Sequence, residues 1–191
     1  MMKLILASQS PQRRQILEEM NLDFDVIPPD HDAEDAQKPN ESPTELVRRL
    51  ARQKAENVFR RLCEDVLVIG CDTVVVCRGE ILGKPIDRDD AQRMLRLLQG
   101  ERHQVLSGLC LLAVERRCCE VAATELSMQS LTEREIGDYL NAGLWEGKAG
   151  AFGYQDGHPW ITIIEGSESN VIGLPKELLQ QIIETWHDGG V

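Results

Sequence analysis

Runs of apolar residues separated by polar turns predict an α/β fold. The strongest run, VLVIGCDTVVVC at residues 66–77, is apolar enough for a central strand that is covered on both faces. Shorter runs predict further strands at residues 3–7, 23–27, 81–82, about 103–114, about 118–128 and 160–165.

Helix starts are marked by N-cap residues followed by proline or by acidic side chains. Ser42 and Thr132 each open a capping box, with a glutamate three residues later. The predicted helices span residues 11–20, 43–62, 88–99, 133–141 and 175–186. We therefore expect helices packed on a mixed sheet in one domain over residues 1–191, with a frayed tail at 188–191.

Composition and charge narrow the classes of function. The chain is 42% hydrophobic and 28% charged, and no apolar run approaches the roughly 18 residues that a membrane span needs. The first strand runs into a polar turn and does not resemble a signal peptide, so we expect no membrane partner and a cytoplasmic protein. The net charge of −11 disfavours polymeric nucleic acid as a partner. A small polyanion can still bind where cations converge or a metal intervenes.

The six cysteines show no CxxC pair and no zinc-like spacing with histidine. Cys71, Cys77 and Cys110 lie within apolar runs, where cysteine behaves as a small hydrophobic residue. We expect reduced thiols, and a thiol enzyme that uses Cys71 as its nucleophile is the alternative.

Asp72 is the sharpest signal for chemistry, because it lies in the middle of the long apolar strand. An unpaired carboxylate is costly to bury, so Asp72 is expected to have a cationic partner, a metal or a proton. A hydrogen-bonded structural aspartate would give the same pattern.

Arg13 and Arg14 fall in the first turn of a predicted helix, where the macrodipole disfavours each cation by roughly 0.3–1 kcal/mol. Helix amides and a guanidinium can together hold a phosphate. We expect Arg13 to face an anionic ligand and Arg14 to pair with Glu18, four residues later.

Other charged residues are weaker signals when each is judged alone. Lys84 lies in a Gly-Lys-Pro turn and Lys148 in a Gly-Lys-Ala-Gly segment, yet an isolated lysine is more often a solvated surface charge. The same holds for Glu34 in the acidic loop 28–41 and for Lys54 on the second predicted helix. The chain has no Walker A motif, which excludes a P-loop nucleotide site.

Six ordered motifs resemble the Maf family of nucleotide pyrophosphatases over about residues 3–180. They read LASQSPQRR, ESPTELVRRLARQKA, VIGCDTVV, GEILGKP, GKAGAFGYQ and VIGLP. The resemblance implies a fold related to inosine-triphosphate pyrophosphatases, with a long mixed sheet and two lobes around a central cleft. It also implies a divalent cation (Mg²⁺ or Mn²⁺), a homodimer, and hydrolysis of a nucleoside triphosphate to the monophosphate and pyrophosphate.

The resemblance assigns roles by position. Asp72 matches the family's catalytic aspartate, and Glu34 and Asp72 are the expected metal ligands. The other polar residues expected to bind substrate are Ser10, Arg13, Lys54, Glu80, Lys84 and Lys148. In this scheme Asp72 activates a water that attacks the α-phosphorus, while cations offset charge on the departing pyrophosphate.

Three positions bear on base choice. Thr73 and Gln155 resemble the family branch that acts on dTTP and UTP, and a carboxamide can match the N3–H/O4 edge of uracil or thymine. Gln12 departs from both main branches. The alternatives are 7-methyl-GTP or another noncanonical nucleotide as substrate, and a non-catalytic regulator of septum formation. The regulator predicts damaged charged motifs, whereas here they are intact.

Overall fold

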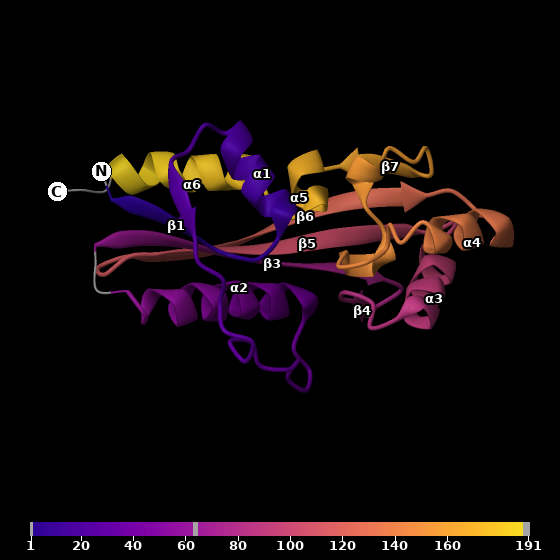
Figure 1. Cartoon of the computed structure of the whole chain (residues 1–191), viewed down its shortest axis with the longest axis horizontal. Coiled ribbons are helices and arrows are strands. Elements are labelled where there is room, and N and C mark those ends of the chain that lie inside the picture. The colour runs from indigo at the N-terminus through magenta and orange to yellow at the C-terminus, as the bar shows by residue number, and fades with distance from the viewer. Residues whose placement is uncertain (1, 63–64, 189–191) are drawn as a thin grey trace. The chain divides into compact units, whose positions relative to one another are not determined.

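The computed structural model describes residues 2–62 and 65–188, and its strands form a seven-stranded sheet in the order β2-β1-β3-β5-β6-β7, with β4 paired to β3 (Figure 1). The strands are β1 (Lys3–Ala7), β2 (Phe24–Val26), β3 (Val66–Cys77), β4 (Glu80–Leu82), β5 (Arg102–Leu112), β6 (Arg117–Met128) and β7 (Ile161–Glu165). The helices are α1 (Pro11–Glu19), α2 (Pro43–Phe59), α3 (Arg88–Leu98), α4 (Glu133–Asn141), α5 (Glu168–Ile172) and α6 (Lys176–Asp188). Parallel and antiparallel pairs both occur, which confirms the predicted mixed α/β class.

Most differences from the predicted elements are small. The helix expected to reach residue 62 ends at Phe59, because the amides of Arg61 and Leu62 bond three residues back and tighten the chain into a turn. The five-residue helix α5 was not predicted, since it is too short to show an apolar period. Helix α6 extends to Asp188, and the remainder of the predicted tail lies outside the described residues. Within the described part of the chain, no helix combines the length and apolar character needed to cross a bilayer.

The chain divides into two compact units, which are described separately. Unit 1 comprises residues Met1–Asp72, Ser107–Ala122 and Gly173–Val191, and unit 2 comprises Thr73–Leu106 and Ala123–Ile172. The division falls within β3, β5 and β6, each of which contributes residues to both units.

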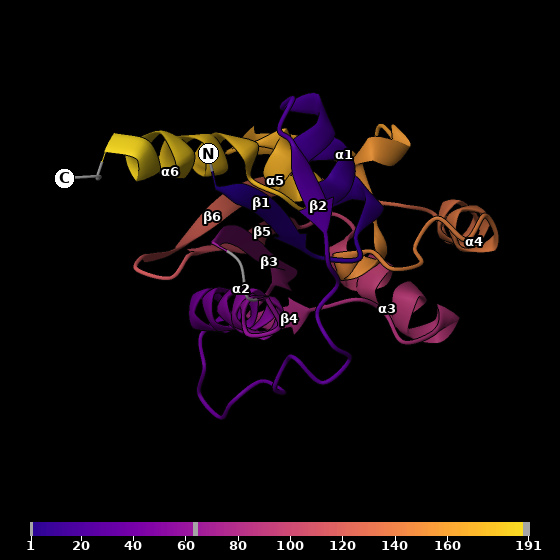
Figure 2. The same ribbon diagram turned by 60° about the vertical axis from the view of Figure 1, so that its left-hand side comes forward.

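In unit 1, parallel strands are covered on both faces. Strand β1 lies between β2 and β3, with Leu4 opposite Phe24 on one side and Leu67 on the other. Helix α2 covers one face, and α1 and α6 cover the other (Figures 1 and 2). This double coverage explains why β1 and β3 are almost continuously apolar.

Two glycines allow α2 to lie unusually close to the sheet. A Cβ placed on Gly70 of β3 would lie 2.1 Å from the carbonyl oxygen of Ala51, and one on Gly108 of β5 would lie 2.0 Å from that of Val47. The facing residues Ala51 and Ala55 of α2 are small and fully buried. Small side chains on both elements therefore fix the depth at which α2 packs.

Unit 2 has its own apolar core. Helix α3 begins at the N-cap Asp87 and buries one helical face, made of Ala91, Met94, Leu95 and Leu98. It packs on α4 and on the 3₁₀ turn Ala149–Ala151. Strand β4 folds back on β3, and β7 pairs antiparallel with β6.

His103 is a neutral histidine inside unit 2. Its side chain is 3% exposed and packs edge-to-face on Phe152, with ring centroids 5.5 Å apart. Neither ring nitrogen bonds to a described residue. Burial lowers the pKa of His103 to about 4, outweighing a smaller opposing effect of the Glu101 backbone.

The expectation of six reduced thiols is wrong for one pair. Cys110 of β5 and Cys119 of β6 form a disulfide, with Cα atoms 4.2 Å apart. Cys71, Cys77 and Cys118 remain thiols, and Cys63 lies outside the described residues. The pairing depends on the register of β5 against β6, which cysteine spacing does not reveal.

We expect Gly70→Ala to destabilise the protein by about 1–3 kcal/mol, because the new methyl group would overlap the α2 backbone. Gly137→Ala in α4 is the control, since a Cβ there meets nothing within 4 Å and should stabilise the helix by about 0.5–1 kcal/mol. Urea unfolding of both variants tests this, and an unchanged midpoint for Gly70→Ala would contradict the packing described.

We expect stability to fall on acidification because of His103. Its pKa is depressed in the folded state, so the unfolded chain binds the extra proton and the free energy of unfolding falls from about pH 6.5 toward about pH 4. The loss between about pH 7.5 and about pH 4.5 should be roughly 2 kcal/mol. His103→Leu should flatten this dependence in urea unfolding. The pKa of the Glu41 carboxyl is lowered from 4.5 to about 2, so its contribution to the free energy of unfolding is lost only below about pH 4.5. An equally steep curve for the variant would contradict the assignment.

Candidate active site

Asp72 of β3 has a cationic partner, as its burial requires. Alternation along β3 directs Val68, Gly70 and Asp72 toward α2, and the Lys54 ammonium on α2 donates to Asp72 Oδ1 at 2.5 Å. Both residues are nearly buried, with relative exposures of 8% for Lys54 and 9% for Asp72. Asp72 Oδ2 makes no bond to a described residue, so one carboxylate oxygen is fixed and the other is available to a ligand.

Lys54 also reaches a second carboxylate. Its Nζ lies 3.2 Å from Oε1 of Glu34, whose side chain is 38% exposed. One ammonium therefore bridges the two carboxylates that were predicted as metal ligands, and the cluster keeps a net negative charge. Two carboxylates suit Mg²⁺ or Mn²⁺, which also take phosphate and water oxygens. No group of three or more potential His, Cys, Asp or Glu ligands occurs among the described residues.

The loop that carries Glu34 is tied to α2 by Arg49, a residue that the sequence analysis missed. The buried Arg49 guanidinium donates to both carboxylate oxygens of Glu41, at 2.6 and 2.8 Å, and to the carbonyls of Asp35 and Ala36. These bonds lower the pKa of Glu41 to about 2. The signal was present in ESPTELVRRLARQKA, where glutamate and arginine lie eight residues apart, but the motif alone does not pair them.

The turn before α1 gathers polar groups in unit 1. The Ser10 hydroxyl accepts from the Arg13 amide as an N-cap and donates to Gln12 Oε1 at 3.0 Å. The Arg13 guanidinium donates to the Gly173 carbonyl at 2.8 Å and to the Ser8 hydroxyl at 3.3 Å. Arg13 therefore ties the start of α1 to the short segment between α5 and α6.

Arg14 behaves as predicted. Its Nε lies 2.8 Å from Oε1 of Glu18, and both side chains are more than half exposed. Of the two first-turn arginines, Arg14 pairs on the surface of α1, whereas Arg13 is directed into unit 1.

In unit 2, Lys148 lies in a network that includes two residues absent from the predicted site. Its ammonium donates to both carboxylate oxygens of Asp156, each at 2.6 Å, and Asp156 also accepts from the Tyr139 hydroxyl at 2.8 Å. Burial, reinforced by Asp156, raises the pKa of Tyr139, so the phenol remains a donor. The only sequence signal for Asp156 is its place after Gln155 in GYQDG.

The remaining predicted residues of unit 2 lie at or near its surface. Glu80 on β4 pairs with Arg93 of α3, and Lys84 is exposed in the turn after β4. Thr73 follows Asp72 in β3 and is half-buried, while Gln155 is exposed on the 3₁₀ turn Tyr154–Asp156. The structure thus brings together Asp72, Lys54 and Glu34 in unit 1, and places Glu80, Lys84 and Lys148 in unit 2.

Cys71 does not have the setting of a nucleophile. Its side chain is fully buried, and its Sγ donates to the Gly173 carbonyl at 3.3 Å. Reactive thiols are accessible and have neighbours that favour the thiolate. The thiol-enzyme alternative finds no support in this geometry.

Comparison with known proteins places these residues in context. Residues 3–186 match the family described as Maf-like protein. A dTTP/UTP pyrophosphatase from Rhodopirellula baltica is 46% identical over 186 residues, covering 96% of this chain and 82% of the relative. Proteins of the same name from Vibrio vulnificus and Thermotoga petrophila are each 41% identical, covering 96% and 95% of this chain and 98% and 88% of their own lengths.

A likeness to a solved structure is much weaker. The crystal structure of a nucleoside-triphosphatase / dITP/XTP pyrophosphatase from Mycobacterium abscessus is 13% identical, with a TM-score of 0.43, and covers 98% of this chain and 97% of its own. That likeness is too weak to carry an argument about function.

Proposed function

The chain belongs to the Maf-like protein family, and we propose from this that it hydrolyses the α–β phosphoanhydride of dTTP or UTP to the monophosphate and pyrophosphate. The observation that carries the proposal is that Asp72, in an otherwise apolar strand, forms a buried ion pair with Lys54 of α2. The substrate class is supported by three curated relatives at 41–46% identity that are named dTTP/UTP pyrophosphatases.

Asp72 is proposed as the general base. Lys54 holds Oδ1, so Oδ2 can accept a proton from a water molecule. The water oxygen then bonds to the α-phosphorus, the bond from that phosphorus to the α–β bridging oxygen breaks, and pyrophosphate departs. A lysine that fixes the carboxylate in one orientation reduces the reorganisation needed at the moment of attack.

We propose that a divalent cation is held by Glu34 and Asp72, with substrate phosphates completing its oxygen ligands. When bound, such a cation neutralises phosphate charge and favours departure of pyrophosphate. Lys54, within 3.2 Å of both carboxylates, would keep them oriented between turnovers.

The other binding residues are proposed by position. Ser10 is the N-cap of α1 and Arg13 lies in its first turn, where helix amides and a guanidinium suit a phosphate. In unit 2, Lys84, Lys148 and Glu80 are proposed as substrate-binding residues on the family resemblance alone. The homodimer that the resemblance implies also remains a prediction.

Base preference is proposed to depend on Thr73 and Gln155, with Gln12 as a modifier. Gln155 is exposed, so its carboxamide can pair with the edge of uracil or thymine. Gln12 accepts a hydrogen bond from Ser10, which links it to the proposed phosphate-binding turn.

We expect Asp72→Asn to lower kcat for dTTP by about 100-fold or more, because the amide cannot take the proton. Lys54 keeps Glu34 as a partner, so the variant should fold. Asp25→Asn, which removes an exposed carboxylate paired with Lys3, is the control and should keep full activity. Pyrophosphate release and thermal melting are the measurements. An Asn variant with normal turnover would remove Asp72 from the mechanism.

We expect a panel of triphosphates to rank dTTP and UTP above 7-methyl-GTP by about tenfold or more in kcat/KM, because a site that pairs with a pyrimidine edge leaves polar groups unmatched on a purine. Gln12→Arg, assayed beside the wild type, should retain this order. If 7-methyl-GTP is the faster substrate, the assignment of base preference is wrong even though the hydrolase remains.

A further inference from the structure

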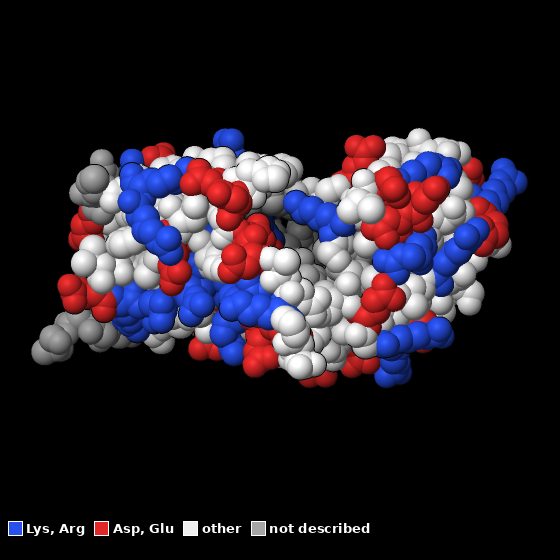
Figure 3. All heavy atoms as spheres, turned by 90° about the horizontal axis from the view of Figure 1, so that it is seen from below, with Lys and Arg blue, Asp and Glu red and all other residues white. Residues whose placement is uncertain are grey.

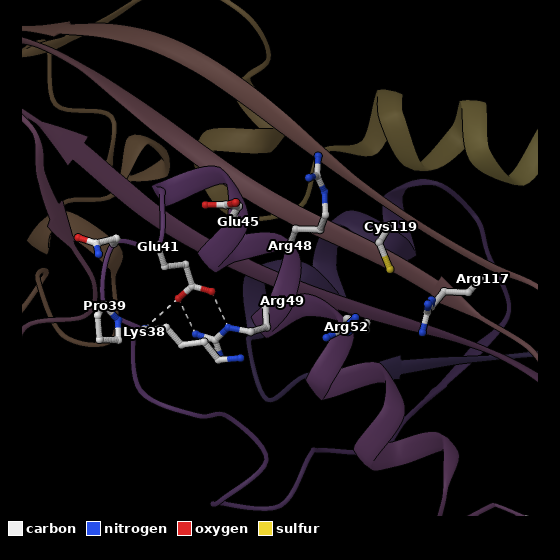
Figure 4. A pocket seen from close by; sticks show the side chains of 10 residues that line it. Lys38, Pro39, Glu41, Glu45, Arg48, Arg49, Arg52, Arg117 and Cys119 are labelled. Atoms are coloured by element: carbon white, nitrogen blue, oxygen red, sulfur yellow. Dashed lines mark hydrogen bonds and ion pairs between the residues drawn. The ribbon is translucent and has the colours of Figure 1, made fainter.

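Unit 1 contains a cavity of about 550 Å³ that the proposed mechanism does not use (Figure 4). It lies along α2, between the segment Lys38–Glu41 and the β6 residues Arg117 and Cys119. Neither Lys54 nor Asp72 is among its lining residues. The volume falls within the roughly 300–1,000 Å³ typical of small-ligand sites.

The lining is strongly basic in a chain whose net charge is −11. Five cations line the cavity: Lys38, Arg48, Arg49, Arg52 and Arg117. The side of unit 1 that carries α2 shows a band of Lys and Arg side chains (Figure 3). A local excess of this kind attracts anions despite the overall charge.

The two carboxylates of the cavity are already engaged. Glu41 receives both of its short bonds from Arg49, which turns toward it in Figure 4. Glu45 closes the capping box with Ser42, at 2.6 Å from the serine hydroxyl. Neither carboxylate forms an ion pair with Arg48, Arg52, Arg117 or Lys38 among the described residues.

The remaining cations have few close carboxylate partners among the described residues. Arg48 is exposed and makes no hydrogen bond or ion pair with a described residue, although its charge interacts with that of Glu45. The Lys38 ammonium likewise makes no hydrogen bond or ion pair with a described residue, and its charge interacts with that of Glu41. Arg52 and Arg117 share the carboxylate of Glu56, at 3.7 and 3.2 Å, and Arg60 also pairs with it at 3.5 Å. The Arg52 Nε atom is buried without a hydrogen-bond partner in the described part of the chain. Donors are therefore in excess where α2 and β6 face the cavity.

We propose that this cavity binds a linear polyphosphate, either inorganic or as the phosphate chain of a nucleotide. Guanidinium groups from two elements offer the paired donors that phosphate oxygens accept. No aromatic side chain is among the lining residues, so phosphate groups rather than a base provide the recognition. The cavity is a second anion site, apart from the Asp72–Lys54 pair.

The test is calorimetric titration of the full chain with inorganic tripolyphosphate, for wild type and for Arg48→Gln/Arg117→Gln. The matched control, Arg96→Gln/Arg134→Gln, also removes two surface arginines, each from an ion pair with a carboxylate that does not line the cavity. We call Arg48→Gln/Arg117→Gln the cavity variant. At about 0.15 M salt, its affinity for tripolyphosphate at one site should fall by about tenfold or more, and that of the control by less than about twofold. Hydrolysis of dTTP should stay within about twofold in both variants, which separates this site from the catalytic one.

A second arm distinguishes the source of the phosphates. The second ligand is a non-hydrolysable α,β-methylene analogue of dTTP. If its binding to the cavity is also lost in Arg48→Gln/Arg117→Gln, the phosphates belong to a nucleotide. If only tripolyphosphate binding is lost, the cavity binds an inorganic chain. The single variant Arg48→Gln, at an exposed unpaired residue, serves if the double variant melts early. The proposal is overturned if tripolyphosphate binds the cavity variant as it binds the control. It is also overturned if a hexaglutamate peptide binds wild type more tightly than tripolyphosphate, since the site would then take an acidic protein segment.

Discussion

The close packing of α2 on β3 is the constraint from which the cluster of Asp72, Lys54 and Glu34 follows. Gly70 and the alanines of α2 let the two backbones approach, and the alternation of β3 then places Asp72 on the same face as Gly70. Lys54 lies on the matching face of α2, so the two charges meet with almost no water around them. Removal of Lys54 would leave the buried Asp72 carboxylate without its ion-pair partner, whereas removal of Asp72 leaves Lys54 paired with Glu34.

Local sequence signals predicted much of unit 1. The capping box at Ser42, the extent of β3 and the pairing of Arg14 with Glu18 depend on residues within one element, and all three occur in the structure. The need of Asp72 for a partner was also predictable, because burial of a lone carboxylate is costly. The family resemblance selected Lys54 only as a substrate-binding residue. Its pairing with Asp72 depends on the register between a helix and a strand, which leaves no local pattern in the sequence.

Contacts between distant segments were the features that sequence reasoning missed. Lys148 was selected by the family resemblance, but its bonds to Asp156 and the link to Tyr139 depend on how the loop that follows α4 folds. The Cys110–Cys119 pairing depends on which residues of β5 and β6 face each other. Arg49 was not predicted, because the sequence does not distinguish a buried arginine from an exposed one until the loop that it anchors is known.

Thr73 and Gln155 belong to unit 2, whereas Asp72, Lys54 and Glu34 belong to unit 1. Under the proposed roles, the residues for bond cleavage belong to unit 1 and two of the three residues for base preference belong to unit 2. Asp72 and Thr73 are nevertheless neighbours in the chain. Substitutions in unit 2 can therefore change the preferred base while the residues proposed for bond cleavage stay unchanged. Gln12 is the exception, because this proposed modifier of base preference lies in unit 1 with Asp72.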